Sequence, residues 1–108
     1  MGYLYKITVK IDDEKLIREK RHDPEAVYKT VRNTFARCEF EEQPSEDGAL
    51  VFTIGEGKDS FSNVSIAINV LRESWLGVYL AKILWYDSSD DSTEDVFEEI
   101  EAFKKKYG

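Results

Sequence analysis

Residues 61–74 read FSNVSIAINVLRES, and the topology of the fold depends on whether this stretch is a strand or a helix. As a strand, it alternates polar or small side chains with β-branched ones, which are Val64, Ile66, Ile68 and Val70. As a helix, it gathers polar side chains on one side and ends near a glycine cap at Gly77; these polar residues are Ser62, Ser65, Asn69, Arg72 and Glu73. The β-branched residues favour the strand, and the helix stays open as the alternative.

Two elements before this stretch have strong local patterns. Residues 3–11, YLYKITVKI, alternate with period two, which predicts a strand. Asp23 and Pro24 supply an N-cap carboxylate and a first-turn proline, and the apolar residues after them keep helical spacing. This pattern predicts a helix over 24–37. Between the two elements, residues 15–21, KLIREKR, are interpreted as a strand, with an irregular link as the alternative.

A hairpin is predicted between residues 40–44 and residues 49–54. The intervening turn ends in Asp-Gly, and glycine tolerates the positive φ that a tight turn requires. Pro44 has no backbone N–H to donate, so it marks the first strand as an edge of the sheet or as the end of that strand.

The C-terminal part of the chain is predicted to hold one more strand and one more helix. Residues 78–86 are apolar on both faces apart from a single lysine, which is typical of a strand inside a sheet. Ser92 and Asp95 resemble a helix capping box. The apolar residues from Val96 onwards step at helical spacing, which predicts a helix over 93–107.

We therefore expect residues 1–108 to form a single globular α+β domain. If residues 61–74 are a strand, the domain is one mainly antiparallel sheet covered by two helices, 24–37 and 93–107. If they are a helix, the order becomes the ferredoxin-like β-α-β-β-α-β with an extra C-terminal helix.

Acidic residues dominate the formal charge of the chain, which is −7, and they fall into two blocks. Residues 38–60 hold seven acidic residues and one lysine, and residues 87–108 hold eight acidic residues and three lysines. Such a surface favours cationic partners. The single cysteine excludes an internal disulfide and fits a reducing compartment. Because neither a signal peptide nor a membrane-spanning run is recognised, we expect a cytoplasmic protein without membrane contact.

The sequence lacks a recognisable catalytic, cofactor-binding or metal-binding set, so we do not expect an enzyme. A catalytic pair of Cys38 and His22 needs the two side chains in contact, whereas a buried structural cysteine is the ordinary case. Zinc-ligand spacings are absent from the sequence. Residues 55–60 lack the spacing of a phosphate-binding loop. The acidic residues that could bind calcium lack the order of a calcium loop and its central glycine; they are Asp87, Asp90, Asp91, Glu94 and Asp95.

A short basic cluster precedes the first predicted helix and consists of Lys15, Arg18, Lys20, Arg21 and His22. One interpretation is a contact with nucleic acid. The other is a solvated edge strand, where basic side chains discourage aggregation. Because glutamates interrupt the cluster and the whole chain is acidic, we expect no direct binding of nucleic acid.

The leading functional hypothesis is a small acidic, non-enzymatic binding protein whose partner is a basic protein. Its carboxylates would mimic phosphates in the basic groove of a nucleic-acid-handling enzyme, as in an anti-CRISPR protein or another nuclease inhibitor. The residues expected to bind the partner are Glu41, Glu42, Glu46, Asp47, Asp87, Asp90 and Asp91. The alternatives are a toxin-immunity protein and a housekeeping or regulatory domain whose acidity serves only solubility.

Overall fold

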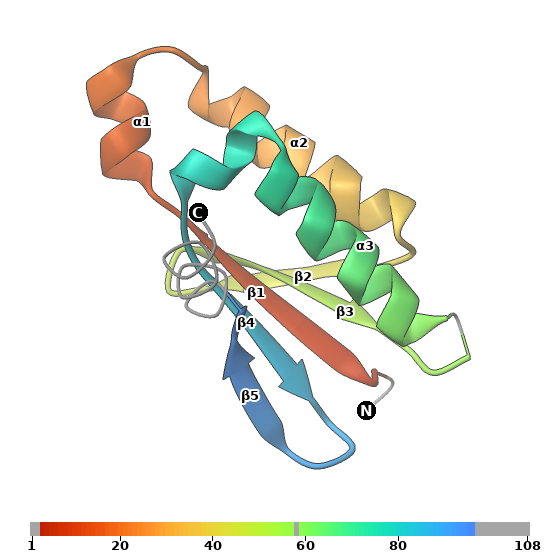
Figure 1. The fold of residues 1–108 in the computed structure, drawn as a ribbon. Coiled ribbons are helices and arrows are strands. Elements are labelled where there is room, and N and C mark those ends of the chain that lie inside the picture. The colour runs from red at the N-terminus through yellow and green to blue at the C-terminus, as the bar shows by residue number, and fades with distance from the viewer. Residues whose placement is uncertain (1–2, 58, 97–108) are drawn as a thin grey trace, which may run out of the picture.

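The structure is a computed structural model in which residues 3–57 and 59–96 are described (Figure 1). The described residues form strands, α-helices and η1, which is a short 3₁₀ helix. In chain order the elements are β1 (Tyr5–Ile11), α1 (Asp13–Glu19), α2 (Pro24–Arg37), β2 (Glu41–Glu46), β3 (Ala49–Ile54), α3 (Ser60–Glu73), η1 (Trp75–Tyr79), β4 (Leu80–Asp87) and β5 (Ser92–Asp95).

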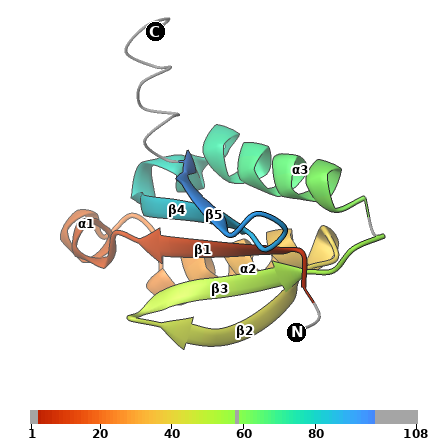
Figure 2. The ribbon, with the colours of Figure 1, turned by 90° about the horizontal axis from the view of Figure 1, so that it is seen from below.

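The strands form one sheet in the order β2-β3-β1-β4-β5, and every neighbouring pair is antiparallel. Figure 2 shows β2, β3 and β1 side by side in this order, with α2 behind them. β1 lies at the centre of the sheet, where Ile7 is opposite both Phe52 of β3 and Trp85 of β4. The expected mainly antiparallel sheet is therefore confirmed.

α2 and α3 lie side by side and cover one face of this sheet (Figure 1). The apolar side chains of β1, β3 and β4 that point toward these helices are buried with them in one core. Phe35 of α2 stacks on Phe52 of β3, with the ring centroids 4.2 Å apart. Burial of one such side chain stabilises a fold by about 1.5–3 kcal/mol, so the contact between the helices and the sheet is the main source of stability.

Several predicted elements are confirmed by the structure. The helix over 24–37 is α2, and the Asp23 carboxylate accepts a hydrogen bond from the backbone N–H of Glu25 at 3.1 Å, as an N-cap residue does. The predicted hairpin is β2 and β3, with β2 at the edge of the sheet. In its turn, Asp47 and Gly48 have φ of 50° and 78°, the backbone that an Asp-Gly turn favours.

The strand interpretation of residues 61–74 is wrong, because residues 61–73 belong to α3 and Ser74 is its C-cap. The side chains that α3 buries recur at helical spacing: Val64, Ala67, Ile68 and Leu71. Ile66 and Val70, which a strand would place on the same face as Val64, are exposed. Packing of one helical face against the sheet therefore outweighs the β propensity of the branched residues.

The strand interpretation of residues 15–21 is also wrong, because most of them lie in α1. Asp12 caps this helix by accepting a hydrogen bond from the backbone N–H of Lys15 at 3.1 Å. Leu16 then enters the core. The strand predicted over residues 78–86 starts later than expected, since residues 78 and 79 belong to η1 and β4 begins at Leu80.

The predicted helix over 93–107 is wrong over its first turn, where residues 92–95 form β5. β4 offers a free edge, and Trp85 of β4 pairs with Glu94 of β5. The hydrogen bonds of this ladder outweigh the capping-box pattern. Residues 97–107 of the predicted helix lie outside the described residues. Within the part of the chain that the structure describes, the helices that cover the sheet are α2 and α3.

The order of the elements contains the β-α-β-β-α-β series that a helix over residues 61–74 implies. It also contains α1, inserted after β1, and β5, which follows β4 at the edge of the sheet. None of the described helices is both long and apolar enough to span a membrane.

Candidate functional site

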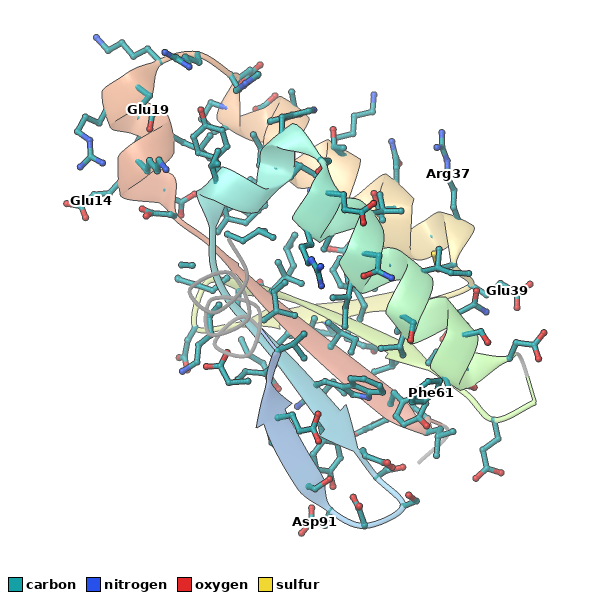
Figure 3. The ribbon with its side chains drawn as sticks, in the orientation of Figure 1. Glu14, Glu19, Arg37, Glu39, Phe61 and Asp91 are labelled. Carbon is teal, nitrogen blue, oxygen red and sulfur yellow. The ribbon has the colours of Figure 1, made fainter. Side chains whose placement is uncertain are left out.

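The seven acidic residues predicted to bind a partner lie in two separate hairpins. The first acidic hairpin, β2–β3, carries Glu41, Glu42, Glu46 and Asp47. The second acidic hairpin, β4–β5, carries Asp87, Asp90 and Asp91, and Figure 3 shows Asp91 in the connection between its strands.

These two hairpins occupy opposite edges and opposite ends of the sheet. The turn of the first lies beside the end of β1, since Lys10 donates a hydrogen bond to the carbonyl oxygen of Asp47 at 3.2 Å. The second starts beside the beginning of β1, where Tyr5 is opposite Asp87. With a strand rise of about 3.3 Å and a strand spacing of about 4.8 Å, the two turns are on the order of 20 Å apart. The structure therefore does not join the seven residues into one acidic patch.

Two carboxylates of the first acidic hairpin already pair with cations of the same chain. Glu42 accepts from Arg32 of α2 at 3.0 Å, and Glu46 lies 3.4 Å from the ammonium of Lys6. Such exposed pairs contribute about 0–1 kcal/mol each, so a partner can displace them. They nevertheless reduce the negative potential that this hairpin presents.

The carboxylates of the second acidic hairpin bind neighbouring hydrogen-bond donors within the hairpin. Asp87 accepts from the backbone N–H and the hydroxyl of Ser89, at 2.9 and 2.7 Å. Asp90 accepts from the same two groups of Ser92, at 3.1 and 2.6 Å. None of the three ion pairs formed among the described residues involves Asp87, Asp90 or Asp91. Their negative charges are therefore not neutralised by a described cation.

Asp91 differs from the other two carboxylates of its hairpin in its hydrogen-bond partner. It accepts a hydrogen bond of 2.6 Å from the hydroxyl of Tyr86, which lies on the sheet face opposite the helices. This hydrogen bond, followed by burial and the charge of Asp91, raises the pKa of Tyr86 to about 12.

An aromatic hollow of about 310 Å³ lies beside the second acidic hairpin. We use this name for the space lined by Tyr5, Phe61, Trp85, Asp87, Asp90, Ser92 and Glu94. Trp85 packs edge-on against Tyr5, with ring centroids 5.4 Å apart, and lies 5.6 Å from the ring of Phe61. Burial raises the pKa of Tyr5, and the charges of Asp87 and Asp90 raise it further.

The sequence predicted a partner contact at Asp87 and Asp90 but not at the aromatic residues, and it singled out Glu94 only as a possible calcium ligand. One usable signal was the spacing of Trp85 and Asp87, which places both on the same face of a strand. Phe61 gave no signal, because it comes from α3 and reaches the hollow only through the packing of that helix on the sheet (Figure 3).

His22 and Cys38 do not form a catalytic pair. They lie at opposite ends of α2, whose 14 residues span about 21 Å at a rise of 1.5 Å per residue. Cys38 is buried, and burial raises the pKa of its thiol, which disfavours the nucleophilic thiolate. His22 stacks on Trp75, with ring centroids 4.1 Å apart.

The other candidates for chemistry serve the local structure. Ser60, at the end of the glycine-containing loop, donates its hydroxyl hydrogen bond to the carbonyl oxygen of Gly55. Lys15 of the basic cluster donates to the carbonyl oxygen of Val78 at 3.0 Å. Within the described residues, no group of three or more His, Cys, Asp or Glu side chains is arranged to hold a metal ion.

The sequence matches no protein-family model, and no curated protein resembles it in a sequence comparison. The two acidic hairpins carry exposed charge, and the aromatic hollow beside the second of them includes an exposed aromatic ring.

Proposed function

We propose that this chain is a small acidic binding protein, with no catalytic role, that presents the second acidic hairpin to a basic partner protein. The observation that supports this most directly is the group of three carboxylates, Asp87, Asp90 and Asp91, which form no ion pair among the described residues. Negative charge that no described cation neutralises attracts a positively charged partner and stabilises the complex once it has formed.

The partner we propose is a nucleic-acid-handling enzyme, such as a nuclease, and the chain would act as its inhibitor in the manner of an anti-CRISPR protein. A groove that binds nucleic acid is lined by lysine and arginine side chains spaced to meet phosphates. A narrow two-stranded hairpin with carboxylates at its end offers such a groove negative charges that replace those phosphates.

The second acidic hairpin is a better candidate than the first for this contact. Glu42 and Glu46 would have to leave Arg32 and Lys6 before they could pair with a partner. The carboxylates of the second acidic hairpin would exchange only hydrogen bonds to hydroxyl and amide groups beside them. Because the hairpins are on the order of 20 Å apart, a narrow groove that receives one of them need not reach the other.

One observation favours the alternative, a domain whose acidity serves only folding and solubility. Asp87 and Asp90 each accept two hydrogen bonds from a serine two residues later, a pattern that stabilises turns without any partner. A toxin-immunity protein would share the charge complementarity of the leading proposal and would differ in the identity of the basic partner.

The test starts by capturing the partner from native host cells and purifying it. Three variants are then compared with the parent chain. The first replaces Asp87, Asp90 and Asp91 by Asn. This removes the charges and keeps a side-chain oxygen that can accept the hydrogen bonds of the turn. The second carries Gln at Glu41, Glu42 and Glu46 and Asn at Asp47. The matched control carries Gln at three exposed glutamates elsewhere, which are Glu14, Glu39 and Glu56.

We expect the first variant to bind at least tenfold more weakly, since three pairs of about 0.5 kcal/mol each amount to that factor. The dependence of its affinity on salt should also flatten, because fewer charges are left to be screened. The control should bind nearly as tightly as the parent. Circular dichroism verifies that each variant is folded. If the parent and all three variants bind the partner equally tightly, at low and at high salt, the proposal is contradicted.

A further inference from the structure

We propose that the aromatic hollow receives one arginine side chain of the basic partner, with the guanidinium against the aromatic rings and inside the ring of carboxylates. This proposal rests on the function proposed above and identifies where the partner is anchored. The proposed function requires only that negative surface charge attracts the partner. Here, in addition, the partner must carry an arginine that fits the hollow, and this requirement would determine which partner binds.

The walls of the hollow are suited to a flat organic cation. Phe61 is 63% exposed, which is unusual for a large aromatic side chain, and it stands next to the ring of Trp85. Aromatic faces attract cations through their quadrupole, most strongly for tryptophan. A guanidinium also stacks on such faces and is more weakly hydrated than an ammonium, so arginine suits this site better than lysine.

The register of the sheet places the carboxylates around these rings. Tyr5 is opposite Asp87, Asp87 is opposite Ser92, and Trp85 is opposite Glu94. Opposed residues share a face of the sheet, so this group faces the same side as α3. Asp90 completes the lining from the turn. Three carboxylates therefore surround an apolar floor, and none of the described residues that line the hollow is basic.

The charge and the size of the hollow narrow the choice of occupant. Three carboxylates repel phosphates and acidic side chains. The volume of about 310 Å³ is at the lower end of the range for ligand pockets, which is about 300–1,000 Å³, so it suits one long side chain. A bare metal ion is a poor match, because aromatic carbons line much of the space and supply no ligand atoms.

Asp91 provides a control within the same turn. It is next to Asp90 in the sequence and carries the same charge, but its carboxylate binds Tyr86 on the opposite face of the sheet. Neutralising Asp90 or Asp91 therefore changes the net charge equally, while only Asp90 lines the hollow.

The experiment uses short synthetic peptides with blocked termini as probes. One carries a single arginine between glycines, and the matched peptide carries citrulline, which has the shape of arginine without its charge. Binding to the full chain is followed by NMR through the indole N–H signal of Trp85. A Trp75→Phe variant assigns that signal, since the chain has two tryptophans.

We expect the arginine peptide to shift the Trp85 signal in a saturable way and the citrulline peptide to leave it unchanged. Phe61→Ala should weaken binding by about two- to fivefold, the loss of one exposed cation–π contact. Phe61→Leu, which keeps an apolar side chain without the ring, should weaken it similarly. Asp90→Asn should weaken binding by about two- to fivefold, the loss of one exposed charge pair, and Asp91→Asn should change it less.

The proposal is overturned if the arginine peptide leaves the Trp85 signal unchanged, if citrulline binds equally well, or if Asp91→Asn weakens binding as much as Asp90→Asn. The two proposals fail in different ways. Loss of partner binding in the triple-Asn variant, with no response of Trp85 to the arginine peptide, would leave the proposed function standing and refute the anchor. A response of Trp85 together with undiminished partner binding by the triple-Asn variant would refute the proposed function.

Discussion

Lys10 of β1 and Lys82 of β4 are directly opposite each other in the sheet. Both side chains lie on the face that α2 and α3 leave uncovered, together with Lys6 and Thr8, because they alternate with buried residues of their strands. Lys10 donates a hydrogen bond to the carbonyl oxygen of Asp47, which draws its ammonium toward the first acidic hairpin. Like charges in directly opposed positions of an antiparallel pair still destabilise it.

Replacing Lys82 by glutamate should therefore stabilise the protein. The change converts a repulsive cross-strand pair into an attractive one, and such pairs contribute roughly 0.2–1 kcal/mol. The free energy of unfolding, measured by urea denaturation at low salt, should rise by an amount in this range. Lys82→Gln, which removes the charge without reversing it, should give part of the gain. A loss of stability in both variants would show that Lys82 makes a favourable contact.

Replacing Asp91 by asparagine should lower the pKa of Tyr86. The carboxylate of Asp91 is the first cause of the high value of about 12, because it accepts the phenolic hydrogen bond and its charge opposes phenolate formation. Ultraviolet titration of the tyrosines between pH 9 and pH 13 measures the change. Tyr28, whose pKa burial and Asp13 raise to about 12, should be unaffected and serves as the internal control.

The same two tyrosines should make the fold less stable in alkali. An unfolded tyrosine loses its proton near pH 10, whereas Tyr28 and Tyr86 keep theirs to about pH 12 in the folded chain. Above pH 10 the folded state thus binds more protons than the unfolded state, so the free energy of unfolding falls between about pH 10 and pH 12. Denaturant melts across this range should show a steeper decline for the parent than for Tyr28→Phe.

Truncation of Phe35 to alanine should cost about 3–5 kcal/mol, because it removes a large buried ring and leaves a cavity. Phe35 is 0% exposed and contacts the rings of Phe40 and Phe52. Phe61→Ala is the matched control: that side chain is 63% exposed, and its removal should change stability by no more than about 0.5 kcal/mol. Thermal and urea unfolding measure the loss of stability in each variant. A small loss of stability in Phe35→Ala would contradict the core described above.

Cys38 should react slowly with thiol reagents in the folded protein. Its side chain is buried at the end of α2, and burial raises the pKa of the thiol, so little thiolate is present near neutral pH. A colorimetric thiol assay should give a rate that increases by orders of magnitude in denaturant. A fast reaction under native conditions would reveal frequent opening of this part of the core.

The parts of the fold that the sequence predicted are those set by neighbouring residues. Asp23 and Pro24 begin a helix through contacts within one turn, and Asp47 and Gly48 form a turn by their own backbone preferences. The strand over 61–74 was a wrong prediction because the competing signal is tertiary: the face of α3 that contains Leu71 is buried against a sheet formed from distant residues. β5 likewise forms on the edge that β4 provides, which a local pattern does not reveal.

In the candidate site, too, only the features determined by neighbouring residues could be predicted from the sequence. The acidic character of the two hairpins could be read from the chain, but their separation depends on the order of the strands in the sheet. The aromatic hollow combines Tyr5, Phe61 and Trp85 from three different elements, so it was not visible before the elements were assembled. Their convergence is a property of sheet register and helix packing together.

The central place of β1 has a consequence for how the protein is made. β1 is translated before β3 and β4, the two strands that flank it in the sheet, and Tyr5 pairs with Asp87. At 5–20 residues per second, translation from the first of these residues to the second takes roughly 4–16 s. During that interval the nascent chain lacks a complete β4, the strand that pairs with one edge of β1. The aromatic hollow, which needs residues from both ends of this span, is therefore completed after translation of β5, and a ribosome that stalls earlier releases a chain without it.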